Sequence, residues 1–124
     1  MTWYIASLVS LIEQTEGGQQ VFPMFEEYYL FEAHTDAELQ AHIAAEADSI
    51  QAAGASGLRY CGKEATQRYL GVRQINALPA QPVDGAWLTR SRMIAASREE
   101  AERYAQGEGV WLRCVPDLPL QAQP

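Results

Sequence analysis

The two histidines are the side chains that could bind a metal ion or transfer a proton near neutral pH. His42 and Glu46 stand four residues apart in a segment with helical spacing, so both could contact one metal ion or share one proton. Zinc needs three protein ligands and a water, or four protein ligands, and no third ligand can be assigned to this pair. His34 stands just before the start of that helix. We therefore predict a solvated His42–Glu46 pair and neither a metal site nor a cofactor.

The two cysteines, Cys61 and Cys114, lack the CxxC spacing of zinc and redox motifs. Both fall in segments rich in strand-forming residues. We predict that each is a small buried hydrophobe that stays reduced in the cytoplasm.

Motifs of nucleophilic and phosphate-binding chemistry are absent from the sequence. There is no Gly-x-Ser-x-Gly and no phosphate-binding glycine loop, and Gly107-Glu108-Gly109 follows a predicted helix instead of opening one. Glu26 and Glu27 are adjacent in a predicted strand, so they point to opposite faces and cannot share a proton. We predict that the protein is not an enzyme.

Charge is divided unevenly along the chain, whose formal net charge is −7. Residues 1–58 contain nine acidic residues and no lysine or arginine, whereas residues 59–124 contain seven acidic and nine basic residues. An acidic surface without interleaved bases repels nucleic acid and anionic membranes, and it attracts a basic protein over roughly 8–10 Å. Negative charge also keeps proteins soluble whether or not they bind a partner, and this alternative stays open.

Aromatic residues gather with acidic ones in residues 21–32. If this segment is a strand, one face carries Val21, Phe25, Tyr29 and Phe31 toward a core. The other face, or an exposed edge, presents Tyr28 among carboxylates, which is a composition suited to a protein interface. The predicted partner-binding residues are Glu26, Glu27, Tyr28, Glu32, Asp36 and Glu38.

The elements that position these residues begin with a strand over residues 3–12, whose two faces are both largely apolar, as in the middle of a sheet. Residues 16–19 form a turn, and residues 21–32 return as a strand with Pro23 at an edge or bulge. Thr35 and Glu38 form a capping box that opens a helix. Gly54 ends this helix.

The second half predicts shorter elements. Strands are expected over residues 58–61, 68–78, 87–95 and 110–115, and Ser97 with Glu100 forms a second capping box. Together the elements predict a single α+β domain over residues 1–118, with five or six antiparallel strands and two helices packed on one face. Residues 119–124 are expected to form a frayed tail.

Residues 3–12 are too short to span a membrane and lack the features of a signal peptide, which predicts a cytoplasmic protein. Trp3-Tyr4, the segment Tyr28–Ala33, Tyr69-Leu70-Gly71-Val72 and Asp84-Gly85 resemble a small bacterial family catalogued as domain of unknown function 4288. The resemblance covers residues 3 to about 94. It implies a bacterial cytoplasmic α+β domain and no catalytic residues.

These observations favour a non-enzymatic protein that binds a basic protein partner. In style, though not in motif, the chain is similar to immunity proteins, so a cognate toxin whose active site it covers is the most concrete partner. Two alternatives are a subunit that completes a larger complex and a small-molecule (anion) binding domain or minor enzyme. In the latter, an anion would contact Arg90, Arg92 and Arg113 in a pocket between sheet and helices.

Overall fold

A computed structural model describes residues 1–115 and divides the chain into two compact units, Met1–Leu88 and a second unit that begins at Thr89. The predicted α+β class is confirmed. The strands form one four-stranded antiparallel sheet and a separate two-stranded sheet, instead of the single sheet of five or six strands that we expected. The prediction of a single domain over residues 1–118 stays a prediction. The predicted tail, 119–124, lies outside the described residues.

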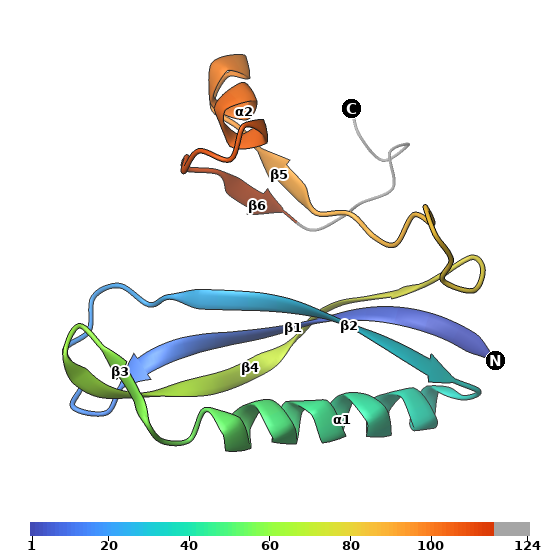
Figure 1. Ribbon diagram of the computed structural model, residues 1–124, viewed down its shortest axis with the longest axis horizontal. Helices are drawn as coiled ribbons and strands as arrows, with labels where there is room; N and C mark the ends of the chain where they lie inside the picture. Colours follow the sequence, from blue (N-terminus) through green and yellow to red (C-terminus); the bar gives the residue numbers. More distant parts are fainter. Residues whose placement is uncertain (116–124) are drawn as a thin grey trace. The chain divides into compact units, whose positions relative to one another are not determined.

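The first unit is built on strands β1 (Thr2–Gln14), β2 (Met24–Ala33), β3 (Leu58–Tyr60) and β4 (Lys63–Ala77). They form an antiparallel sheet in the order β2-β1-β4-β3, drawn in Figure 1. The apolar residues on both faces of β1 predicted its interior position. Strand β1 is paired on both sides, and its residues Ile5, Ala6 and Leu8 are all buried.

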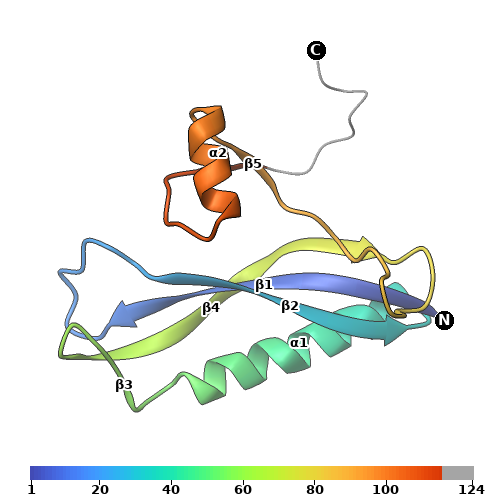
Figure 2. The same ribbon diagram turned by 45° about the horizontal axis from the view of Figure 1, so that its top comes forward.

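Helix α1 (Asp36–Ala53) lies along one face of this sheet (Figures 1 and 2). The predicted capping box is present. The Glu38 N–H donates to Thr35 Oγ1 at 3.1 Å, and the Glu38 carboxylate accepts from the His34 N–H at 3.2 Å. The core under the helix consists of Ala6, Leu8, Phe31, Ala33, Leu39 and Ile43.

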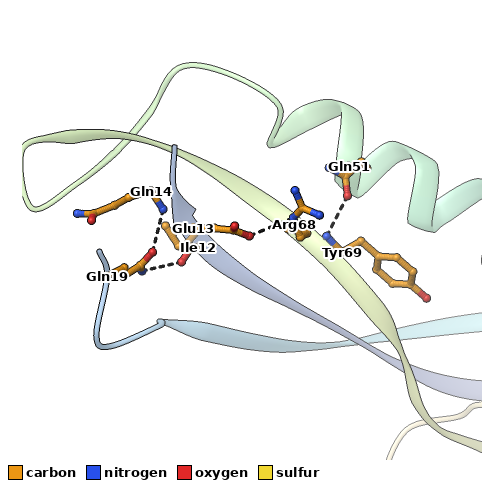
Figure 3. A network of polar contacts seen from close by, with 7 residues as sticks. All are labelled: Ile12, Glu13, Gln14, Gln19, Gln51, Arg68 and Tyr69. Carbon is orange, nitrogen blue, oxygen red and sulfur yellow. Dashed lines mark hydrogen bonds and ion pairs between the residues drawn. The ribbon is translucent and has the colours of Figure 1, made fainter. Parts of the chain in front are cut away.

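The loop between β1 and β2 is held by one side chain, Gln19. Its Oε1 accepts from the Gln14 N–H at 2.8 Å, and its Nε2 donates to the carbonyl of Ile12 at 2.9 Å (Figure 3). The same Nε2 also donates to the carbonyl of Val21 at 2.9 Å. The loop holds Val21 outside the ladder, so β2 begins at Met24, three residues later than the sequence predicted.

The turn between β3 and β4 corrects the prediction for Cys61. Cys61 and Gly62 form a two-residue turn with φ angles of 52° and 75°, so Cys61 is an exposed turn residue instead of a buried strand residue. Positive φ at both turn residues matches the right-handed twist of a hairpin, although it costs about 1–2 kcal/mol at a residue other than glycine. The carbonyl of Gly62 accepts from Arg59 Nη1 at 2.8 Å, which supports the turn.

The second unit contains β5 (Arg92–Ile94), α2 (Arg98–Ala105) and β6 (Arg113–Val115), with β5 and β6 antiparallel. The Ser97 cap is present, since its Oγ accepts from the Glu100 N–H at 3.1 Å. The predicted strand over residues 87–95 is reduced to β5. Cys114 is exposed in β6, so the prediction that it is buried was wrong. No residue of α2 is buried, because a three-residue ribbon offers little surface for a core.

Within the described chain, no helix has the length and apolarity to cross a membrane.

Candidate protein-binding site

Strand β2 forms one edge of the four-stranded sheet, so one side of its backbone has no neighbouring strand in the described chain. The Ile12 N–H donates to the carbonyl of Pro23 at 2.9 Å, which sets the phase of the β1–β2 ladder. In an antiparallel ladder alternate residues point their backbone groups toward the partner. The odd-numbered residues of β2 therefore bond β1, and the even-numbered residues direct their backbone groups outward. We call this outward side of residues 24–32 the β2 edge.

The side chains of the β2 edge divide between the two faces of the sheet. Glu27 and Tyr29 lie opposite Leu8 and Ala6 of the core, so odd-numbered side chains share the face that α1 covers. The even-numbered side chains project from the second face. These are Met24, Glu26, Tyr28, Leu30 and Glu32.

Large apolar side chains are exposed along this strand. Met24 is 63% exposed, Tyr28 47% and Leu30 44%, and Phe25 on the helix face is 46% exposed. Sheet edges are usually protected by charge, bulges or covering segments, since an open apolar edge invites pairing with another chain. These exposed side chains lie on both faces of one edge strand, Phe25 on the helix face and the other three on the second face. The sequence prediction that Tyr28 lies exposed among carboxylates on an edge agrees with this arrangement.

Glu26 is neutralised within the chain by Arg73. Arg73 is the extra residue of a bulge in β4 and faces no residue of β1, and its side chain reaches across β1 to pair with Glu26. Burial raises the pKa of Glu26, but hydrogen bonds from Arg73 and Ser7 lower it by more, so the net shift is downward. Arg73 in turn has a raised pKa, chiefly because it donates to Glu26. Glu26 is therefore ionised at neutral pH and already paired with Arg73.

Glu27 belongs to a different cluster, between β2 and α1. The pKa of Tyr29 is raised by burial first, then by the charges of Glu27 and Glu46 and by a hydrogen bond with Glu27. The two carboxylates therefore lie near one phenol, although Glu27 is on the strand and Glu46 on the helix. Tyr29 stacks on Phe31 with ring centroids 6.2 Å apart. Glu46 thus joins the acidic surface. The sequence placed it only beside His42, because linear spacing does not show which strand a helix crosses.

The remaining predicted residues lie near the end of β2. Glu32 is half-buried and pairs in register with Trp3. Asp36 and Glu38 stand in the first turn of α1, where Glu38 is committed to the cap. The structure therefore brings Glu26, Tyr28 and Glu32 together on one face of β2, and it places Glu27 on the other face. Asp36 and Glu38 follow at the start of the helix.

The charge asymmetry of the sequence becomes a spatial asymmetry in the first unit. Residues 1–88 contain eleven acidic and four basic residues. All four bases belong to β3 and β4, at the far side of the sheet from β2. Two of them pair with acidic residues: Arg68 with Glu13 at 3.1 Å and Arg73 with Glu26. Strand β2 and helix α1 contain seven acidic residues and no lysine or arginine.

The arginines of the alternative anion site belong to the second unit. Arg92 pairs in register with Val115 and Ile94 with Arg113, so Arg92 and Arg113 project from the same face of the two-stranded ribbon. Arg90 precedes β5. Arg113 also lines a shallow hollow of about 340 Å³ together with Ile94 and Trp111. This hollow lies within the second unit, whereas we expected a pocket between the main sheet and its helices.

Within residues 1–115, no three His, Cys, Asp or Glu side chains gather in a way that could hold a metal ion. The chain was compared with family models, curated proteins and solved structures, and none of them matches it. The resemblance to domain of unknown function 4288 stays a prediction.

Proposed function

We propose that this chain is a non-enzymatic protein-binding domain that uses the β2 edge and the adjoining face of α1 to bind a cationic protein. The observation that carries the proposal is the composition of this surface. Exposed aromatic and aliphatic side chains lie on the same strand as carboxylates that project from both of its faces, and every base of the first unit stands on β3 or β4. Aromatic anchors supply binding energy, and the acidic surroundings select a basic partner.

In its most concrete form, the proposal is that the chain is an immunity protein or antitoxin of the bacterial cytoplasm. The partner is then a basic toxin, and the acidic surface inhibits it by covering the cationic cleft in which it binds its own anionic substrate. Long-range attraction would raise the association rate, which should fall steeply as salt is added.

The test compares two charge-reversed variants that differ only in where the charge is changed. Glu27→Lys/Glu32→Lys alters the β2 edge, and the control Glu16→Lys/Glu64→Lys alters the same number of carboxylates near the β1–β2 loop and the start of β4. Glu26 is left intact, since its reversal would also break its pair with Arg73. A partner is first captured from the native host with the unaltered chain. Its association rate with each variant is then measured at several salt concentrations.

We expect the β2 variant to lose at least tenfold in association rate and most of the salt dependence, and the control to stay within about twofold to threefold. For a toxin partner, inhibition of its activity should fall in parallel. Equal effects of the two variants, or an association rate that does not depend on salt, would contradict the proposal.

A second candidate function is anion binding by the second unit, because Arg92 and Arg113 share a face of its ribbon. Such an anion would raise the melting temperature of the chain, and Arg113→Ala would abolish the rise. A screen of phosphate- and carboxylate-containing metabolites that finds no stabilising anion would remove this candidate.

A further inference from the structure

The β2 edge presents backbone groups as well as side chains. In the described chain, no hydrogen bond occupies the outward backbone groups of Met24, Glu26, Leu30 and Glu32. The opposite edge differs, since β3 and the end of α1 occupy the first part of β4. The unoccupied backbone groups of these four residues are a template for one further strand.

The two faces of β2 would recognise different side chains in an added strand. On the helix face, Glu27 and the nearby Glu46 provide negative charge beside the ring of Tyr29. On the second face, the neutralised Glu26 contributes little net charge, whereas Met24 and Leu30 are exposed and apolar. Since side chains alternate along a strand, the fitting sequence has a basic residue at every second position and apolar residues between them.

A second copy of this chain fits the edge poorly. Two β2 strands paired about a two-fold axis would bring Glu27 and Glu32 of each copy beside the acidic residues of the other. The first unit, with eleven acidic and four basic residues, would also repel its own copy. Charge complementarity therefore favours a basic segment from a different protein.

We propose that the β2 edge binds an extended basic segment of the partner as an additional antiparallel strand, with its basic side chains facing Glu27 and Glu46 and its apolar side chains facing Met24 and Leu30. This inference rests on the proposed function, and it adds the mode of binding and the sequence pattern of the bound segment.

The test uses synthetic ten-residue peptides with alternating lysine and valine. In an antiparallel pair, directly opposed residues share a face, so the valines oppose the even-numbered residues of β2 and turn their amides toward that strand. Methylating the backbone amide nitrogens of the valines should lower the peptide's affinity at least tenfold. Methylating the backbone amide nitrogens of the lysines should change the affinity by less than twofold. The two methylated peptides have equal charge and equal methyl content, which makes each a control for the other. A peptide of alternating glutamate and valine should not bind.

Each outcome separates the inference from the proposed function. Equal binding of both methylated peptides and the unmodified peptide would overturn strand addition, while salt-sensitive binding of all three would still support a cationic partner. Absence of binding by every lysine peptide, or equal binding by the glutamate peptide, would count against both. Concentration-dependent dimers of the peptide-free chain that protect the amides of β2 would replace the basic segment by a second copy.

A pair of variants tests the same edge from the side of the protein. Leu30→Pro removes one outward N–H without removing a bond to β1, and Leu30→Ala keeps the N–H while shortening the side chain. We expect at least a tenfold loss of peptide affinity in Leu30→Pro and a loss below threefold in Leu30→Ala. Similar losses in the two variants would show that the side chain matters and the backbone does not. If Leu30→Pro does not fold, the methylated peptides decide the question with the unaltered chain.

Discussion

The two sides of the four-stranded sheet differ in how far the backbone groups at the edge are hydrogen-bonded to other parts of the chain. On β4, strand β3 pairs with residues 63–65, the Gln67 N–H donates to the Gly54 carbonyl at 2.9 Å, and the Tyr69 N–H donates to Gln51 Oε1 at 3.0 Å (Figure 3). Beyond Tyr69, two bulges interrupt the ladder that joins β4 to β1. On β2, no strand of the described chain pairs with the outward side, and the outward backbone groups of Met24, Glu26, Leu30 and Glu32 accept or donate no hydrogen bond there.

This contrast shows that covering a sheet edge requires particular residues at the point of contact. The end of α1 reaches β4 because Gly54 has no side chain: a Cβ placed there would lie 2.4 Å from the Cβ of Gln67. Natural sheets protect their edges in this way or by charge and bulges, and β2 has only its three glutamates for this purpose.

The largest loss of stability is expected when the end of α1 is pushed away from β4. Gly54→Ala would push the end of α1 away from Gln67, and overpacking of this kind costs about 1–3 kcal/mol of unfolding free energy. Urea denaturation measures the change. Gly109→Ala is the control, because a Cβ at Gly109 would meet nothing within 4 Å, and it should alter stability by less than about 0.5 kcal/mol. Equal stability of the two variants would mean that the contact between α1 and β4 is not tight.

A smaller effect is expected from the hydrogen bond that closes this edge. Gln51→Ala removes the acceptor of the Tyr69 N–H, which should cost about 1 kcal/mol and speed the hydrogen exchange of that amide. Gln40→Ala, at an exposed position of the same helix, is the matched control. Unchanged exchange at Tyr69 in the Gln51 variant would show that another group, or water, serves as the acceptor.

The smallest effect concerns the ion pair that neutralises Glu26 beside the open edge. The pKa of Glu26 is lowered by folding, so its contribution to stability is present above its unfolded value near 4.5 and is lost as pH falls through the lower folded value. Glu26→Gln should therefore cost about 0.5–1 kcal/mol at pH 7, and the difference from the unaltered chain should shrink below pH 4.5. Glu16→Gln, in the exposed turn, should show neither effect. A difference that persists undiminished at pH 3 would contradict the assignment.

Local signals in the sequence predicted local structure well. Thr35 and Glu38 marked the start of α1, because a cap depends only on residues three or four apart. The apolar faces of β1 predicted its place inside the sheet. The alternation along β2 predicted that Phe31 faces the core and that Tyr28 does not. The same pattern was wrong for Val21 and Phe25, which are exposed, since Val21 precedes β2 and Phe25 lies near its beginning.

Features that depend on how segments meet could not be predicted in this way. The pairing of Glu26 with Arg73 joins residues 47 positions apart and depends on a bulge in β4. Cys61 was assigned to a strand because its neighbours favour strands, whereas the tight β3–β4 connection requires left-handed backbone angles there. The cluster of Glu27, Tyr29 and Glu46 arises only when α1 crosses β2. The uneven charge was visible in the sequence, but its division between opposite sides of one sheet was not.

The most direct test of the open edge is the hydrogen exchange of two amides, Leu30 on β2 and Tyr69 on β4, with and without the lysine–valine peptide. We expect the Leu30 amide to exchange rapidly in the free chain and at least tenfold more slowly when the peptide is bound, while exchange of the protected Tyr69 amide does not change. If Leu30 is already protected in the free chain, or if its exchange does not change at saturating peptide, the β2 edge is not a docking strand.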